Sequence, residues 1–196
     1  MKIGAIVKDS LILAVITLVL SFLLSGVKVI TQKSIDKAEY EARVAAYNKV
    51  VPGFVSFDNV SDMDIEINSK ARAGFLESDE KMLICKNGES ETVGYIIQST
   101  SRGYGGPLNL IVGFNNEGVI SGVAYANIPQ ETPGLGMKTT EETFLNSWAG
   151  HNYENVNQVD AISGATLSSE GFRQAVTFAC DVVNTLIELN KGGLGE

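Results

Sequence analysis

Residues 108–126 read LNLIVGFNNEGVISGVAYA, two apolar runs separated by the polar segment NNEG. The runs, 108–114 and 119–126, have the length and the β-branched and aromatic content that are typical of strands. Asn and Gly between such runs favour a tight turn, because both tolerate the positive φ that hairpin turns require. The stretch therefore predicts an antiparallel hairpin.

The preceding residues extend this pattern into a sheet. Residues 81–86 and 93–99 are apolar runs on either side of Asn87-Gly88, which predicts a second hairpin. After Asp62, the alternation of Ile65 and Ile67 predicts one more short strand. The core of the domain is thus expected to be an antiparallel sheet.

Helices are predicted on both sides of this sheet. Residues 34–51 form the first, which Pro52-Gly53 ends. Thr139 is expected to begin a short helix as part of a capping box with Glu142. Its apolar contacts would come from Phe144, Leu145 and Trp148.

The last helix is the most regular segment of the chain, and it ends at Lys191 and Gly192-Gly193. Its apolar residues recur at the helical period of about 3.6. They are Phe172, Ala175, Val176, Ala179, Val183, Leu186 and Ile187. Helices at both ends of an antiparallel sheet define an α+β fold.

The N-terminal segment is expected to be a transmembrane anchor. Residues 11–27 carry no charge, and their length is close to the roughly 20 residues that cross a bilayer. A cleaved signal peptide is the alternative, but Leu23-Leu24-Ser25-Gly26 is a poor cleavage site. We expect a cytoplasmic tail and anchor over 1–30, a juxtamembrane helix and connection over 31–60, and the domain over 61–196. A short N-terminal tail favours a single-pass protein whose domain is extracytoplasmic.

The composition excludes several classes of function. The formal net charge is −8, with 23 acidic and 15 basic residues, which argues against a nucleic-acid partner. Cys85, Cys180 and the single histidine, His151, are isolated in the sequence, whereas metal sites need clustered ligands. We therefore expect two buried free thiols, no metal site and no catalytic residue.

The segment that leads into the last helix, residues 160–166, reads DAISGAT and is a candidate anion site. The first amides of a helix have no internal partners and lie at the positive end of its dipole. Gly164 and Ala165 would let a phosphate approach the backbone, and Ser163 and Thr166 supply hydroxyls. An ordinary helix cap is the alternative interpretation of these residues.

The same segment resembles the flavinylation site of the FMN-binding domain family, whose consensus is Asp-x-x-Ser/Thr-Gly-Ala-Thr. Asp160, Ser163, Gly164, Ala165 and Thr166 all match it. The resemblance implies FMN joined by a phosphoester bond to Thr166 by a dedicated flavin transferase, with FAD as the flavin donor. The chain has no base or metal near the motif that would activate the threonine by itself.

Two glycine-rich loops, RGYGGP at 102–107 and ETPGLG at 131–136, precede this motif. Glycine lets a backbone approach a planar ligand, although ordinary turns have the same composition. Both loops resemble segments of the same family, in the same order. The resemblance implies that four residues of the second loop lie near the flavin ring or ribityl chain: Thr132, Gly134, Leu135 and Gly136. It also makes three residues of the first loop candidates for flavin contact: Tyr104, Gly105 and Gly106.

Within the family, the chain resembles most the G subunit of the Rnf complex, an ion-translocating ferredoxin:NAD oxidoreductase. This implies a membrane subunit that passes electrons through FMN between other redox subunits of the complex while ions cross the membrane. Three alternatives stay open. They are the related C-type flavin subunit of a sodium-translocating NADH:quinone reductase, a free-standing anchored flavin reductase, and a non-redox adaptor in which the threonine motif is only a helix cap.

Overall fold

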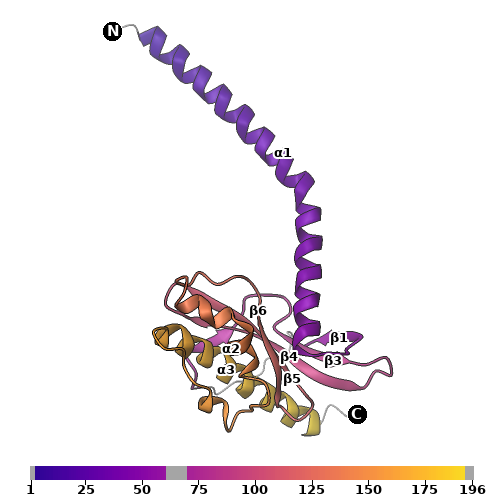
Figure 1. The fold of residues 1–196 in the computed structure, drawn as a ribbon. Coiled ribbons are helices and arrows are strands. Elements are labelled where there is room, and N and C mark those ends of the chain that lie inside the picture. The colour runs from indigo at the N-terminus through magenta and orange to yellow at the C-terminus, as the bar shows by residue number, and fades with distance from the viewer. Residues whose placement is uncertain (1–2, 61–69, 193–196) are drawn as a thin grey trace. The chain divides into compact units, whose positions relative to one another are not determined.

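The computed structural model describes residues 3–60 and 70–192 of the 196-residue chain (Figure 1). The chain divides into two compact units, Met1–Arg43 and Val44–Glu196. Helix α1 (Ile3–Val50) forms the first unit and contributes its C-terminal end to the second. The helix predicted over 34–51 is confirmed, and it continues without interruption from the N-terminal segment.

The first unit contains the segment for which the sequence predicts a transmembrane anchor. Between Leu11 and Leu23 its large apolar side chains are exposed. Among the residues that the structure describes, no helix has both the length and the apolar character needed to cross a membrane.

The second unit is built on one antiparallel sheet of six strands (Figure 1). Five of them lie in the order β1-β3-β4-β5-β6, and β2 pairs with β4. The strands are β1 (Ser56–Asn59), β2 (Ala73–Phe75), β3 (Met82–Lys86), β4 (Thr92–Arg102), β5 (Pro107–Phe114) and β6 (Ile120–Tyr125). Both predicted hairpins are confirmed, as β3–β4 and β5–β6. The strand predicted around Ile65 and Ile67 lies outside the described residues.

An asparagine side chain organises the turn of each hairpin. In the β5–β6 turn, Oδ1 of Asn115 accepts hydrogen bonds from the amides of Glu117 and Val119. In the β3–β4 turn, Oδ1 of Asn87 accepts from the amides of Glu89 and Glu91. Asn stabilises turns in this way, because its side-chain oxygen can accept a hydrogen bond from the backbone amide two residues along the chain.

Four helical segments complete the part of the second unit that the structure describes. They are η1 (Gly136–Thr140), α2 (Glu142–Asn146), η2 (Val156–Gln158) and α3 (Thr166–Gly192). The predicted capping box was wrong, because α2 begins at Glu142 and Thr139 lies within η1. Thr139 is buried, and its Oγ1 hydrogen-bonds to the Gly136 carbonyl and to the Tyr125 hydroxyl. The hydroxyl therefore has partners other than the amides of α2.

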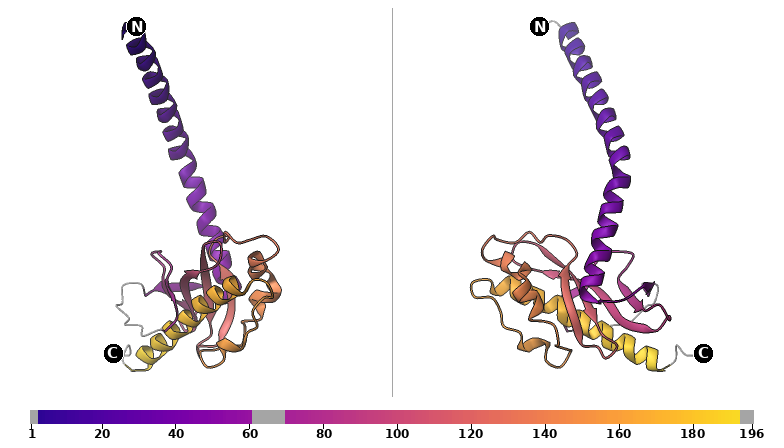
Figure 2. Two further views of the ribbon diagram at one scale, coloured as in Figure 1. Left: turned by 90° about the vertical axis from the view of Figure 1, so that its left-hand side faces the viewer. Right: turned by 45° about the vertical axis from the view of Figure 1, so that its right-hand side comes forward.

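Apolar side chains cover both faces of the sheet. Successive residues of β4 belong to different core clusters, since Ile97 packs in one and Ile96 in the other. Side chains alternate across a strand, so the two clusters lie on opposite faces. Helix α3 covers the first face, where it lies against β4 and β5 (Figure 2). Tyr47, Val50 and Val51 cover the second.

The apolar face predicted for α3 is confirmed, because all seven of its residues are buried. Both cysteines are also buried and free, as predicted. Burial raises the pKa of Cys85 and of Cys180 to about 12, and the charge of Asp181 adds to the effect at Cys180. Both thiols are therefore protonated at neutral pH and are poor nucleophiles.

Phe172 is the centre of an aromatic cluster between α3, α2 and the sheet. Its ring centroid lies 5.1 Å from that of Phe144, 5.2 Å from that of Trp148 and 5.7 Å from that of Tyr125. We predict that Phe172→Ala lowers the free energy of unfolding by about 3–5 kcal/mol, because it leaves a cavity in a closely packed core. Urea denaturation followed by circular dichroism measures this loss. Leu189→Ala, on an exposed part of α3, is the control and should change stability by less than about 1 kcal/mol.

Candidate functional site

Three segments resemble the FMN-binding domain family, namely 102–107, 131–136 and 160–166, and we call them the family-like segments. A pocket of about 400 Å³ lies where they meet. The loop around Tyr104, the loop from Glu131 to Gly136 and the start of α3 all contribute to it. Its lining residues are Tyr104, Glu131, Thr132, Leu135, Gly136, Gly164, Ala165, Thr166, Leu167 and Ser168. Segments that are far apart in the sequence thus form one site of the size that small-molecule ligands occupy.

The start of α3 presents Thr166 at the surface of the molecule. The helix begins at Thr166, so Ala165 is its N-cap residue. The loop before the helix folds onto its first turn, because Ser169 Oγ accepts a hydrogen bond of 3.0 Å from the Ile162 amide. Thr166 is exposed, and it lines the pocket. Its position inside the first turn disfavours the interpretation of Thr166 as an ordinary cap.

Glycine is required at two points of this pocket. Gly164 has a φ of +80°, a conformation that side chains with a Cβ rarely adopt. At Gly136, an added Cβ would collide with the carboxylate of Glu131. These glycines therefore follow from the backbone conformation and from close packing.

Glu131 is one of three pocket residues, with Leu167 and Ser168, to which the sequence assigned no role. Its side chain is only 7% exposed, and it bridges two segments. Oε1 accepts a hydrogen bond of 3.1 Å from the Gly105 amide, and Oε2 accepts one of 2.8 Å from Ser168 Oγ. The Glu-Thr-Pro-Gly sequence contains this residue, but burial of a carboxylate in a loop leaves no periodic signal.

The tyrosine of β6, Tyr125, is half-buried. Burial is the main cause that raises the pKa of Tyr125 to about 12, the hydrogen bond with Thr139 lowers that pKa, and the charge of Glu131 raises it. The phenol is therefore protonated at neutral pH, and it serves as a hydrogen-bonding group of the core.

The structure brings seven of the twelve predicted site residues to the pocket. They are Tyr104, Thr132, Leu135, Gly136, Gly164, Ala165 and Thr166. The other five do not line it: Asp160, Ser163, Gly134, Gly105 and Gly106. Asp160 and Ser163 are exposed in the loop before α3, and Gly105 binds the pocket residue Glu131 through its amide. Glu131, Leu167 and Ser168 are additional lining residues.

The pocket combines exposed apolar side chains with hydroxyl groups. Tyr104, Leu135 and Leu167 are 68%, 45% and 65% exposed, which is high for side chains of this size. Beside them lie the hydroxyls of Thr132, Thr166 and Ser168. A ligand with a flat apolar body and a polar or anionic tail matches this combination.

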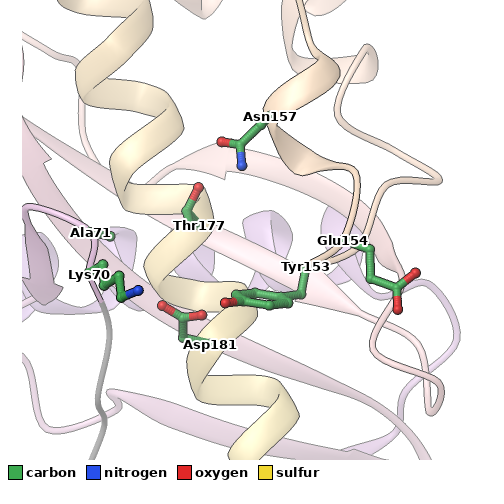
Figure 3. A pocket seen from close by; sticks show the side chains of 7 residues that line it. All are labelled: Lys70, Ala71, Tyr153, Glu154, Asn157, Thr177 and Asp181. Carbon is green, nitrogen blue, oxygen red and sulfur yellow. The ribbon is translucent and has the colours of Figure 1, made fainter.

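A second cavity of about 370 Å³ lies elsewhere on the domain and is shown in Figure 3. Its side chains include Lys70, Tyr153 and Asp181, so it is polar and of mixed charge. It shares no residue with the first pocket and contains none of the family-like segments. The first pocket is therefore the candidate functional site.

Comparison with known proteins bears on what this pocket holds. Residues 103–181, which include the three pocket segments, match the model of the family described as FMN-binding domain. The matched residues resemble the FMN-binding domain family. The match extends from the loop before Tyr104 through Asp181 of α3.

Curated relatives cover most of the chain. It is 28% identical to the G subunit of the Na(+)-translocating ferredoxin:NAD(+) oxidoreductase complex of Acetobacterium woodii, over 91% of this chain and 92% of the relative. It is 26% identical to the G subunit of the ion-translocating oxidoreductase complex of Vibrio parahaemolyticus, over 92% and 90% respectively. Among solved structures, NqrC of Shewanella oneidensis aligns with a TM-score of 0.49 and 17% identity, over 69% and 78% of the two chains.

The residues of the pocket fit FMN. The exposed Tyr104, Leu135 and Leu167 offer apolar surface to a planar ring, and Gly164 leaves its backbone open to a phosphate beside Thr166. The first turn of α3 adds unpaired amides and the positive end of a helix dipole, which both favour an anion.

The conformation of Gly164 gives a testable consequence for the loop before α3. We predict that Gly164→Ala lowers the free energy of unfolding by about 1–2 kcal/mol, because L-residues are strained at positive φ. Gly88→Ala is a matched control, since a Cβ there meets no atom within 4 Å. Its effect should stay within about 0.5 kcal/mol. Equal losses in urea denaturation would contradict this role for Gly164.

Proposed function

We propose that this protein is the electron-transferring flavoprotein subunit of an Rnf-type ion-translocating oxidoreductase. In that complex electrons pass between ferredoxin and NAD. This protein would relay them through FMN that is attached to Thr166 by a phosphoester bond. The observation that carries the proposal is the pocket in which Thr166 meets both glycine-rich loops. The match to the FMN-binding domain and the relatives that are G subunits of such complexes support it.

The position of Thr166 suits a covalent attachment. Its side chain is exposed, so a flavin transferase can reach the hydroxyl. The phosphate would lie beside the first amides of α3, where the helix dipole favours negative charge. Gly164 and Ala165 carry the smallest side chains and would leave room for it. Ser163 and Asp160 lie outside the pocket, in the exposed loop that the transferase would recognise.

FMN, when bound, supplies the electron-transfer chemistry, and the protein sets its orientation and its access to solvent. In this role Tyr104, Leu135 and Leu167 would cover the ring and exclude water from its apolar part. Thr132 and Gly136 would border its polar edge. The covalent bond would keep the cofactor on the protein where a dissociated flavin could not be replaced.

We further propose that α1 attaches the protein to the membrane as a single-pass anchor and that the flavin domain lies on the extracytoplasmic side. The support is the apolar segment of the first unit, whose exposed side chains would be costly in water. They are Leu11, Ile12, Leu13, Val15, Ile16, Leu18, Val19, Leu20, Phe22 and Leu23. The partners of the protein would then be the other membrane and redox subunits of the complex.

The covalent flavin is tested by co-expression of the chain with a flavin transferase, followed by intact-mass measurement after denaturation. We predict that the wild type gains the mass of one FMN less one water and that Thr166→Ala does not gain it. Ser56→Ala is the control, because it removes an exposed hydroxyl of β1 outside both the motif and the pocket and should retain the flavin. Unmodified wild type, with a transferase that modifies a known substrate, would contradict the proposal and favour the adaptor alternative.

Membrane attachment is tested by washing the membranes of expressing cells with alkaline carbonate. The full chain should stay in the membrane fraction, whereas a variant that lacks residues 11–24 should be released, because its apolar segment is gone. Release of the full chain by the wash would refute anchoring through α1.

A further inference from the structure

Among the described residues that line the candidate pocket, Glu131 alone carries a charged group. It is almost fully buried, and each of its oxygens is bound to a different segment of the chain. The Gly105 amide donates to Oε1, and Ser168 Oγ donates to Oε2. We call this pair of hydrogen bonds the Glu131 clamp. It connects the loop after β4, the loop after β6 and the first turn of α3.

The surroundings of this carboxylate are closely fitted to it. An added Cβ at Gly103 would collide with Oε1, and one at Gly136 would collide with Oε2. Glycines at these two positions therefore leave the space that the carboxylate occupies. Gly105 is packed equally closely, because a Cβ there would collide with the carbonyl of Gln130, the residue before Glu131.

Two features offset the free-energy cost of burying the Glu131 carboxylate, its hydrogen bonds and its place at the start of α3. A carboxylate without partners would be costly in such a place, but hydrogen bonds to a charged acceptor are stronger than those between neutral groups. Ser168 is the third residue of α3, so the negative charge also lies at the positive end of the helix dipole. Removal of the side chain would leave both donors without their acceptor.

The Glu131 clamp holds α3 without covering Thr166. Residues two positions apart on a helix differ in direction by about 200°. Ser168 is buried and donates to Glu131, whereas Thr166 is exposed. The same helical turn can therefore be fixed from the inside and modified from the outside.

We propose that Glu131 is a positioning residue of the flavin pocket. Its carboxylate ties the Gly105 loop to the first turn of α3, so that the pocket has its shape before the flavin is attached. The effect of Glu131 on the bound flavin rests on the function proposed above. The Glu131 clamp itself is a property of the protein without flavin.

The Glu131 clamp is tested by hydrogen-exchange mass spectrometry on the full chain without flavin. In Glu131→Ala, peptides that cover 103–107 should exchange about tenfold faster, because the Gly105 amide loses its charged acceptor. Glu131→Gln should stay within about twofold of the wild type, since its amide group can still accept from Gly105 and donate to Ser168 Oγ. Glu141→Ala, an exposed acidic residue, is the matched control and should not change these peptides.

The second measurement uses the flavin-loaded protein and reads the visible circular dichroism of the flavin, which reports how the ring is held. We expect Glu131→Ala to change this spectrum and to lower the yield of covalent flavin several-fold, and Glu131→Gln to restore both. Unchanged exchange in Glu131→Ala would overturn the Glu131 clamp, and an unchanged spectrum would overturn its effect on the flavin. Failure of the proposed function is distinguishable, because the wild type itself would then carry no covalent flavin while the exchange result still decides the clamp.

Discussion

The packing of α3 on one face of the sheet is the interaction on which both the core and the candidate site depend. Its apolar face joins the aromatic cluster of Phe172, Phe144 and Trp148, which fixes the helix along its length. The same packing fixes where the helix begins. Thr166 and the first amides of α3 are therefore held beside the two glycine-rich loops, although the chain places them far apart.

This arrangement places rigid and accessible groups next to each other. The segments around the pocket are held by the buried carboxylate of Glu131, with glycines close around it. Exposed apolar side chains, Tyr104, Leu135 and Leu167, also line the pocket. Fixed backbone next to exposed apolar surface suits the covalently held flavin proposed above, because the link would supply retention and the pocket would supply orientation.

Much of the sheet and of α3 was predictable from the sequence, because both depend on local patterns. The apolar period of α3 and the Asn-rich turns of the hairpins specify these elements over short distances. The start of α2 was not predictable, since Thr139 forms its hydrogen bonds with Gly136 and with Tyr125 of another element. The motif of Thr166 was predictable as a motif. The role of Glu131 was not, because it depends on Gly105 and Ser168, which only the fold brings together.

The most direct test of this account is the crystal structure of the flavin-loaded protein. The account predicts continuous electron density from Thr166 Oγ1 through a phosphate to a ring in the 400 Å³ pocket, against Tyr104, Leu135 or Leu167. A flavin attached at another residue, or a ring bound in the polar cavity of Lys70 and Asp181, would contradict it.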